Sequence, residues 1–407
     1  MKGLNSRLIH GESGIAPFGT LKPSIYQSAA FEFESAEAIE QSFAGLNKLP
    51  AYSRSANPTV LELESRLKIL SGARNAICVS SGMAAISNLV FALCKTGDNI
   101  ITSRFLFGNS LAFFVKTIQP FGIDIKFVDF DKPVTIASQI DSNTRMIFME
   151  SITNPQLQVA DFEKVTTIAY RNGILTVIDN TLLTSYVFDS KKYGFDIEIM
   201  STTKYVSGGA TSIGGVTLFY ETEKYKNVEK LSDFYQKFGQ DALFAKLRRD
   251  VYRNMGACLS SESAWLQILG LETMTLRIDK TIDNALKTAE FLTKHTAVIK
   301  VIYPGLETDQ NYANVQKYFG GKGGCIINFE LGSRQDCFTF LNKLQMIKRA
   351  TNMCDNKSLI IHPHSTIFGE FTEDEKTRCS VNDRQIRFSV GIEDLHDIFS
   401  DLEQALS

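Results

Sequence analysis

A long apolar run is the first feature that the sequence lacks. No stretch approaches the roughly 20 apolar residues that span a bilayer. Residues 1–18 carry charges such as Lys2, Arg7 and Glu12 where a leader would have an apolar core. Membrane insertion and secretion are therefore not expected, and these absences predict a soluble, cytoplasmic protein.

An excess of charge of one sign is also lacking. Lys and Arg together number 43, Asp and Glu together number 45, and the net charge at pH 7 is -2. Nothing in this balance favours a polyanionic partner, so we expect no nucleic-acid binding. The ligands that remain compatible with a charge-balanced chain without a membrane segment are small molecules.

Paired cysteine motifs are missing as well. The seven cysteines are an odd number, are spread singly and include no C-x-x-C pair. A chain of 407 residues is well above the size at which disulfides are needed to complete a small core. The pattern therefore predicts reduced thiols, most of them buried.

Motifs of several common enzyme classes are absent. The glycine-dense loops at 207–215 and 320–324 match neither the dinucleotide-binding pattern nor the P-loop pattern. No G-x-S-x-G segment is present, which argues against a hydrolase triad. His362 and His364 form the one close histidine pair and are two ligands short of a closed zinc site. We therefore expect no metal and assign this pair to a structured loop.

The sequence does contain a regular alternation of strand-like and helix-like segments. Apolar residues recur at helical spacing from Pro58 to Leu70, and Gly72 marks the expected helix end. The following strand-like runs are 76–79, 99–102, 124–128, 145–149, 174–178, 196–200 and 215–219, with helical stretches at 83–95, 110–119 and 161–171. This alternation predicts an α/β fold with a mostly parallel sheet covered by helices on both faces.

The pattern changes after about Tyr220. A charged stretch at 221–248 leads to a long helical pattern at 271–295, and later segments predict strands at 298–303, 324–330 and 386–390 and helices at 334–344 and 394–406. The length of the chain favours two lobes. We expect an arm at residues 1–58 that contacts a neighbouring subunit, a large domain at 59–268 and a smaller α/β domain at 269–407.

The first of three candidate site segments is Ser80-Ser81-Gly82-Met83. It follows a predicted strand and opens a predicted helix. The free N–H groups and the positive end of the helix dipole meet at such a junction, which can bind a phosphate. An ordinary helix cap would have the same sequence, so this segment alone does not decide between the two interpretations.

The second and third segments place a carboxylate and an amine at strand ends. Asp179 ends the apolar run 175–178, at the edge where open α/β sheets bind ligands. It could pair with a protonated pyridine nitrogen, cap a helix or form a salt bridge. Lys204 closes the run 197–200 beside Ser201 and Thr203. A buried lysine there would form an imine with an aldehyde, whereas an exposed one would have no such role. One small molecule that carries a phosphate, a ring nitrogen and an aldehyde would require all three segments.

Six ordered motifs that cover nearly the whole chain resemble one family, the fold-type I pyridoxal-phosphate enzymes of cysteine and methionine metabolism. The motifs are Tyr52–Thr59, Ser80–Met83, Glu150–Pro155, Asp179–Thr181, Ser201–Lys204 and Arg387–Asp394. The resemblance implies pyridoxal 5'-phosphate as the cofactor, Lys204 as the lysine joined to it and as the base that moves substrate protons, and Asp179 as the partner of the pyridine nitrogen.

Further roles follow from the same resemblance. It implies that Gly82, Met83, Ser201 and Thr203 bind the phosphate, that Tyr52 and Arg54 reach in from a neighbouring subunit, and that Phe107 and Asn154 lie at the cofactor ring. It also implies that Asn352 and Arg387 bind substrate, with Arg387 on the α-carboxylate. An active site shared between subunits makes a homo-oligomer the expected assembly, a dimer or a tetramer built from two such dimers.

Several segments lean towards the sulfhydrylases of the family. Residues 204–215, 253–260, 270–273, 351–353 and 359–363 resemble O-acetylhomoserine sulfhydrylase, and lyases commonly have Ser where Asn352 stands. This resemblance implies γ-replacement on an O-acylhomoserine by sulfide or a thiol, which gives homocysteine or methionine. The alternatives are a γ-lyase or γ-synthase acting on methionine or cystathionine, and a relative that binds the cofactor without catalysis.

Three positions depart from the family pattern. Phe107 stands where a tyrosine usually stacks on the ring, Cys354 replaces a usual glycine and Gly209 a usual histidine. Phe107 cannot donate a proton to a leaving group. A carboxylate, whose conjugate acid has a pKa of about 4, departs unaided. A thiolate, whose conjugate acid has a pKa of about 8.5, benefits from an acid that protonates it. An ester is therefore the favoured substrate, and because O-succinylhomoserine sulfhydrylases resemble the chain at Phe107, the acyl group stays open.

Overall fold

A seven-stranded sheet is the centre of the larger part of the molecule. The computed structural model describes residues 3–11, 14, 17–47 and 49–407. The strand order is β1-β7-β6-β5-β4-β2-β3, and only β7 runs antiparallel to its neighbours. The strands are β1 (Asn75–Val79), β2 (Asn99–Thr102), β3 (Asp124–Phe127), β4 (Thr144–Glu150), β5 (Leu175–Asp179), β6 (Ile197–Met200) and β7 (Gly215–Phe219). The predicted α/β fold with a mostly parallel sheet is confirmed.

Both faces of this sheet are buried, which explains why its strands read as continuous apolar runs. Along β4, Met146 and Phe148 belong to one apolar cluster, whereas Ile147 and Met149 belong to the cluster on the opposite face. Successive side chains of a strand point to opposite faces, so each face needs its own helical cover. The α-helices between residues 58 and 187 are α3 (Pro58–Ser71), α4 (Gly82–Leu93), α5 (Gly108–Ala112), α6 (Pro133–Gln139), α7 (Phe162–Arg171) and α8 (Thr184–Val187).

Local capping explains where these helices begin and end. The side chains of Asn57, Ser81 and Asp161 accept hydrogen bonds from the first turns of α3, α4 and α7. Gly72 ends α3 in the left-handed conformation, as its position in the sequence predicts. In the sequence, the α-helices that follow the last strand of the first sheet and precede the first strand of the second are α9 (Ser232–Phe238), α10 (Ala242–Lys246), α11 (Arg253–Met255), α12 (Ser261–Glu272) and α13 (Met274–Lys294).

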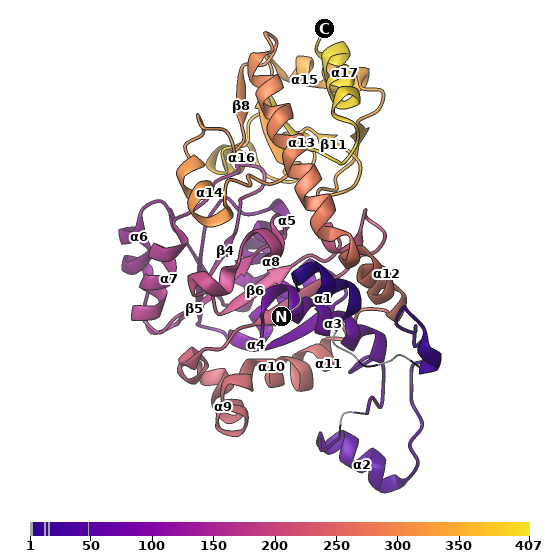
Figure 1. Cartoon of the computed structure of the whole chain (residues 1–407). Coiled ribbons are helices and arrows are strands. Elements are labelled where there is room, and N and C mark those ends of the chain that lie inside the picture. The colour runs from indigo at the N-terminus through magenta and orange to yellow at the C-terminus, as the bar shows by residue number, and fades with distance from the viewer. Residues whose placement is uncertain (1–2, 12–13, 15–16, 48) are drawn as a thin grey trace.

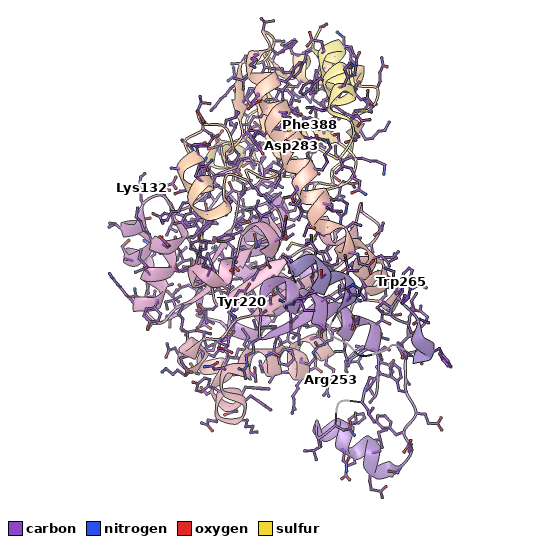
Figure 2. The ribbon with its side chains drawn as sticks, viewed as in Figure 1. Lys132, Tyr220, Arg253, Trp265, Asp283 and Phe388 are labelled. Atoms are coloured by element: carbon purple, nitrogen blue, oxygen red, sulfur yellow. The ribbon has the colours of Figure 1, made fainter. Side chains whose placement is uncertain are left out.

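A second sheet of five strands lies in the C-terminal part of the chain, at the top of Figure 1. Its order is β10-β11-β12-β9-β8, and a separate apolar cluster, which includes Phe388 (Figure 2), fills the space between sheet and helices. The strands are β8 (Lys300–Ile302), β9 (Ile326–Glu330), β10 (Lys348–Arg349), β11 (Leu359–Ile361) and β12 (Gln385–Ser389), and the helices are α14 (Tyr312–Phe319), α15 (Arg334–Lys343), α16 (Glu373–Arg378) and α17 (Leu395–Leu406). The domain boundaries at 58 and 268 stay predictions.

The N-terminal segment is more structured than its weak periodicity indicates. Helix α1 (Leu4–His10) packs on the body of the same chain, where the Arg66 guanidinium donates to the Leu8 carbonyl oxygen at 2.7 Å. Trp265 of α12 (Figure 2) donates to the Pro23 carbonyl oxygen at 3.0 Å. In contrast, α2 (Ala36–Ala44) stands away from the body in Figure 1. Across the residues that the structure describes, no helix is both long and apolar enough to cross a membrane.

Candidate active site

A cavity of about 270 Å³ lies at the carboxyl ends of the central strands. Open α/β sheets bind ligands at this edge because strand ends and helix starts meet there. Its wall includes residues of both sheets, since Arg387 comes from β12 and Asp179 from β5. The lining residues are Ser81, Gly82, Met83, Ile86, Phe107, Ser110, Glu150, Ile152, Asn154, Asp179, Thr181, Leu182, Ser201, Thr203, Lys204, Ile213, Thr351, Met353 and Arg387.

The start of helix α4 forms one end of the cavity. Gly82 and Met83 belong to the first helical turn, whose N–H groups have no intrahelical acceptor. The helix packs so closely on Ser201 that a Cβ added at Gly82 would lie 2.8 Å from the Ser201 Cβ, so only glycine fits. The Thr203 hydroxyl also borders the cavity and is bonded to the Gly214 backbone. This end can bind an anion such as a phosphate.

Asp179 lies at the end of β5 with its carboxylate facing the cavity. One oxygen accepts hydrogen bonds from the Thr181 amide at 3.1 Å and hydroxyl at 2.5 Å. Burial raises the pKa of Asp179, although these hydrogen bonds oppose the shift. Within the described chain, Asp179 has no Lys, Arg or His partner at ion-pair distance, so the alternative of a salt bridge does not hold. A protonated ring nitrogen in the cavity fits this carboxylate.

Lys204 follows β6 and points into the same cavity. Its ammonium donates to the Asn352 side-chain oxygen at 2.6 Å, and the Asn352 amide group donates to Asp355 at 3.0 Å. Burial lowers the pKa of Lys204. A lysine whose charge is disfavoured and whose amine is oriented by an amide is suited to nucleophilic attack and proton transfer.

Arg387 is a buried cation at the opposite wall. Its side chain is 1% exposed, and one guanidinium nitrogen donates to the Thr351 and Asn352 carbonyl oxygens, each at 3.1 Å. Burial lowers the pKa of Arg387 to about 10. Its Nε has no partner, and among the described residues no carboxylate pairs with it. An unpaired buried guanidinium favours a ligand that brings a carboxylate.

Asn154 and Phe107 complete the predicted cavity residues. The Asn154 side chain lies between the two sheets, where it donates to the Met353 sulfur at 3.2 Å and its oxygen lies 3.5 Å from an Arg387 nitrogen. Phe107 precedes α5 and is half-buried. The structure therefore brings together ten predicted residues: Gly82, Met83, Phe107, Asn154, Asp179, Ser201, Thr203, Lys204, Arg387 and, through its bond to Lys204, Asn352.

Glu150 is a cavity residue to which the sequence analysis gave no role. One of its carboxyl oxygens accepts a hydrogen bond from the Phe107 amide at 2.8 Å, and the other has no partner. Glu150 lies beside Asp179 in the register of β4 and β5. Burial, followed by the Asp179 charge, raises the pKa of Glu150 well above its ordinary value. Its place at a strand end, like that of Asp179, is the sequence signal that could have identified it.

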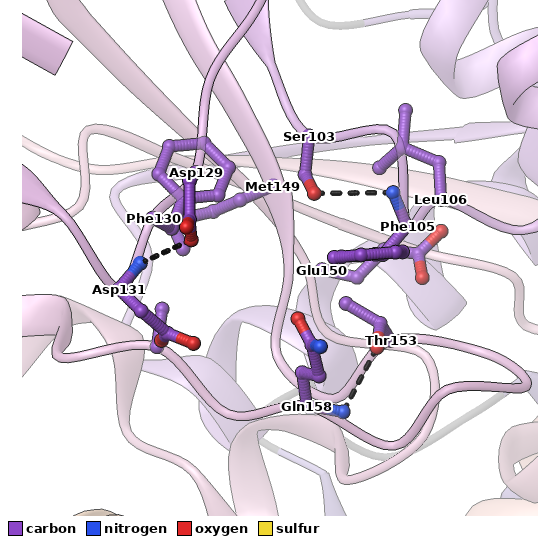
Figure 3. A pocket seen from close by; sticks show the side chains of 11 residues that line it. Ser103, Phe105, Leu106, Asp129, Phe130, Asp131, Met149, Glu150, Thr153 and Gln158 are labelled. Carbon is purple, nitrogen blue, oxygen red and sulfur yellow. Dashed lines mark hydrogen bonds between the residues drawn. The ribbon is translucent and has the colours of Figure 1, made fainter. Parts of the chain in front are cut away.

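A second, much smaller cavity, drawn in Figure 3, has Glu150 in its lining as well. Ser103, Asp129 and Thr153 also line it, and its volume is about 20 Å³. That space holds a water-sized molecule but not a cofactor or an amino acid. The cavity lined by Lys204, Asp179 and Arg387 is therefore the candidate active site.

Tyr52 and Arg54 do not reach the cavity of their own chain. They line a separate groove beside the N-terminal arm, where Arg54 donates to the Arg253 carbonyl oxygen at 2.5 Å. Their predicted contribution to a neighbouring subunit stays a prediction.

His362 and His364 lie in the structured loop predicted for them, and His362 is buried with both ring nitrogens bonded, to Ser365 and to the Asp383 backbone. No cluster of three His, Cys, Asp or Glu residues suited to a metal occurs in the part of the chain that the structure covers.

Comparisons with known proteins match this chain over almost its whole length. The model of the family described as Cys/Met metabolism PLP-dependent enzyme matches residues 5–407. The O-acetyl-L-homoserine sulfhydrylase of Corynebacterium glutamicum is 34% identical, with 98% of this chain and 96% of that protein covered. The L-methionine gamma-lyase of Fusobacterium nucleatum subsp. polymorphum is 33% identical, with 99% and 98% covered.

A solved structure extends the comparison to three dimensions. A Campylobacter jejuni protein described as an O-acetylhomoserine (thiol)-lyase superposes with a TM-score of 0.95 at 31% identity, and 100% of each chain is covered. That structure contains N'-pyridoxyl-lysine-5'-monophosphate at its position 205.

Proposed function

Because the chain belongs to the family of Cys/Met metabolism PLP-dependent enzymes, we propose that it replaces the acyl group of an O-acylhomoserine by sulfide or a small thiol. O-acetylhomoserine is the proposed substrate, and homocysteine or methionine the product, which assigns the enzyme to methionine biosynthesis in the cytoplasm. The observation that carries this proposal is the cavity wall: Phe107 faces the site, and none of the described residues of the same chain that line it is a tyrosine or histidine. The Tyr52 that we propose to enter from a neighbouring chain is assigned to the phosphate.

Pyridoxal 5'-phosphate is the cofactor of this family, and the cavity residues fit it. When bound, it supplies an aldehyde that joins to amines and a ring that delocalises negative charge. The helix start at Gly82 and Met83, with the hydroxyls of Ser201 and Thr203, would hold the phosphate. Asp179 would pair with the ring nitrogen, and Lys204 would provide the amine for the aldehyde.

Phe107 would stack on the ring, and Asn154 would lie beside the ring oxygen. Asn154 already contacts Arg387 and Met353 from the smaller sheet.

The substrate would be held by Arg387 and processed by Lys204. The guanidinium of Arg387 has no carboxylate partner in the described chain, so the α-carboxylate of an amino acid would supply one. The Lys204 amine would take the proton from the substrate Cα and then one from Cβ. Asn352 orients this amine through the 2.6 Å hydrogen bond.

The choice of leaving group depends on whether the cavity wall contains a side chain that can donate a proton to it. An acyl group departs as a carboxylate, whose conjugate acid has a pKa of about 4, and it needs no acid to protonate it. A thiolate would benefit from such an acid, and Phe107 cannot provide one. This favours an ester substrate over methionine or cystathionine.

We further propose that two chains share each active site and that such dimers pair into tetramers. The arm exposes large apolar side chains, among them Phe43 at 73% and Leu46 at 79% exposed. A contiguous exposed apolar surface favours contact with another protein surface. Tyr52 and Arg54, which lie in the groove beside this arm, would then contact the phosphate bound by the neighbouring chain.

The test is a comparison of substrates. We expect the purified holoenzyme to form homocysteine from sulfide and O-acetylhomoserine faster than from the succinyl and phospho esters, and to release little 2-oxobutanoate from methionine. A higher kcat/KM for methionine or cystathionine than for any ester plus sulfide would contradict the proposal and identify a lyase or γ-synthase. A protein that binds the cofactor but responds to none of these substrates would indicate a non-catalytic relative.

A first prediction concerns Glu150, which holds the Phe107 segment. Glu150→Ala removes the acceptor of the Phe107 amide, so we expect cofactor affinity to fall about tenfold, the equivalent of one hydrogen bond to a buried group. Burial raises the pKa of Glu150 well above its ordinary value and so disfavours its charge, and glutamine keeps an oxygen that can accept from the Phe107 amide, so Glu150→Gln should match the parent within about threefold. Absorbance titration of the apoprotein measures both. A Gln variant as weak as the Ala variant would contradict this role.

A further inference from the structure

Two thiols face each other directly behind the active site. Cys325 and Cys354 are both free and buried, and their sulfur atoms lie 3.5 Å apart. They are separated by 29 positions in the sequence and come from different segments. Cys325 precedes β9, and Cys354 lies in the loop between β10 and β11.

The pair is attached to the residues that bind substrate and carry the amine. Cys354 follows Asn352 and Met353, and its amide donates to the Ser389 hydroxyl at 3.0 Å, two residues from Arg387 on β12. The side-chain oxygen of Asn352 accepts a hydrogen bond from Lys204, and its backbone carbonyl oxygen accepts one from Arg387. A displacement of Cys354 would therefore move the partners of both cavity cations.

The Cys325 side of the pair is linked to the same lysine. Tyr205, the residue after Lys204, lies in the same buried cluster as Cys325 and Cys354. The hydrogen bond between the two thiols lowers the pKa of Cys325. A thiol with a lowered pKa is ionised to a larger extent at neutral pH and reacts faster with oxidants.

The backbone at Cys354 is unfavourable for this residue type. Its φ is +54°, in the left-handed region where residues with a side chain are uncommon. Strain of this kind persists where surrounding structure enforces it, and its presence at a site supports a functional hypothesis. Glycine would adopt this backbone without strain but would remove the thiol.

We propose that Cys325 and Cys354 form a reversible disulfide that switches the enzyme off. The oxidant is a small hydroperoxide. Neither thiol lines the cavity, so the hydroperoxide must pass Met353, the residue before Cys354, which borders the cavity. The Cys325 thiolate attacks the peroxide oxygen, which leaves a sulfenic acid and releases an alcohol or water. The Cys354 thiol then displaces the hydroxyl, the sulfur–sulfur bond forms, and the thiol proton leaves with the hydroxyl as water. The two thiols lose two electrons, which reduce the peroxide.

The effect on activity follows from distance. Bond formation brings the sulfur atoms from 3.5 Å to about 2.0 Å, and the two cysteine segments must absorb this change. Cys354 lies next to the Thr351 and Asn352 carbonyl groups that hold Arg387, so we expect part of the shift to fall on them. A displacement of about 1 Å in a catalytic site costs on the order of a hundredfold in rate. The loss of activity rests on the proposed function, whereas formation of the disulfide does not.

The experiment treats reduced holoenzyme with hydrogen peroxide and follows two readouts. Mass spectrometry of peptides should show Cys325 joined to Cys354, and kcat/KM with O-acetylhomoserine and sulfide should fall about a hundredfold. Dithiothreitol should reverse both changes. Absence of the linked peptide overturns the disulfide, and a linked peptide with unchanged kcat/KM overturns the switch. If no substrate is turned over before oxidation, the peptide result still decides whether the disulfide forms.

Variants separate this pair from general oxidation. Cys325→Ser and Cys354→Gly each remove one thiol, and we expect both to keep kcat/KM through peroxide treatment. Cys354→Gly also relieves the positive φ, so folding should be preserved. Cys258, which is partly exposed, provides the matched control: Cys258→Ser should lose activity on oxidation as the parent does. Equal loss of activity in the pair variants would overturn the proposal.

Discussion

Turnover of O-acetylhomoserine with sulfide falls by about 10⁴-fold or more when Lys204 is replaced by Ala. Alanine removes both the amine that joins the cofactor aldehyde and the base that moves the Cα and Cβ protons. The phosphate contacts and Asp179 remain, so the variant should still bind pyridoxal phosphate, which its absorbance would show. Steady-state kcat/KM and a cofactor titration measure the two effects separately.

Two further variants test whether the loss of activity is specific to the amine of Lys204. Lys204→Arg keeps a positive charge but has no usable amine, so its activity should be as low as that of the Ala variant. Lys230 is the matched control, because burial also lowers its pKa, yet it donates to the Phe91 and Cys94 carbonyl oxygens away from the cavity. Lys230→Ala should lose stability and keep kcat/KM. Substantial activity in Lys204→Ala would refute the assignment of the lysine.

Arg387→Met is expected to lower kcat/KM about 10³-fold while it stabilises the protein measured without substrate. The guanidinium supplies the charge-assisted hydrogen bonds to the substrate α-carboxylate, and truncation of such a buried partner costs about 2–5 kcal/mol. Without substrate, however, Arg387 is an unpaired buried cation. Replacing it by an apolar side chain of similar length should raise the free energy of unfolding by about 1–3 kcal/mol. Chemical denaturation and kinetics measure these opposite changes.

Because kcat/KM should fall while the free energy of unfolding rises, a loss of substrate binding can be distinguished from a loss of folding. Arg384, an exposed arginine just before β12, is the control, and Arg384→Met should change kcat/KM by less than about threefold. Arg387→Lys should recover little activity, because an ammonium cannot form the bidentate pair. Wild-type kcat/KM in Arg387→Met would show that another group binds the carboxylate.

The elements of the larger sheet could be predicted because each is encoded locally. The run 175–178 is apolar except for Thr176 because both faces of β5 are buried. Asn57 and Gly72 bound α3 through capping geometry that the sequence displays. Lys204, Asp179 and Gly82 follow such strands, so their convergence at one sheet edge followed from the topology.

Other features depend on contacts between distant segments. Helix α1 has little apolar periodicity and is held on the body by the bond between Arg66 and the Leu8 carbonyl. The short strand β11 forms between β10 and β12, and its three residues are too few for a strand pattern to be identified in the sequence. Likewise, the role of Glu150 depends on an amide 43 positions earlier, at Phe107, and the Cys325–Cys354 contact joins two unrelated runs. No local pattern encodes such pairs.

Residues from both sheets line the cavity, so the site is complete only after nearly the whole chain has been synthesised. Lys204 and Asp179 come from the first half of the chain, whereas Arg387 lies near its end. During synthesis, the amine and the ring-binding carboxylate are made before the group that recognises the amino acid. A growing chain could therefore acquire its cofactor early, yet it would remain inactive until its last strand had been laid down.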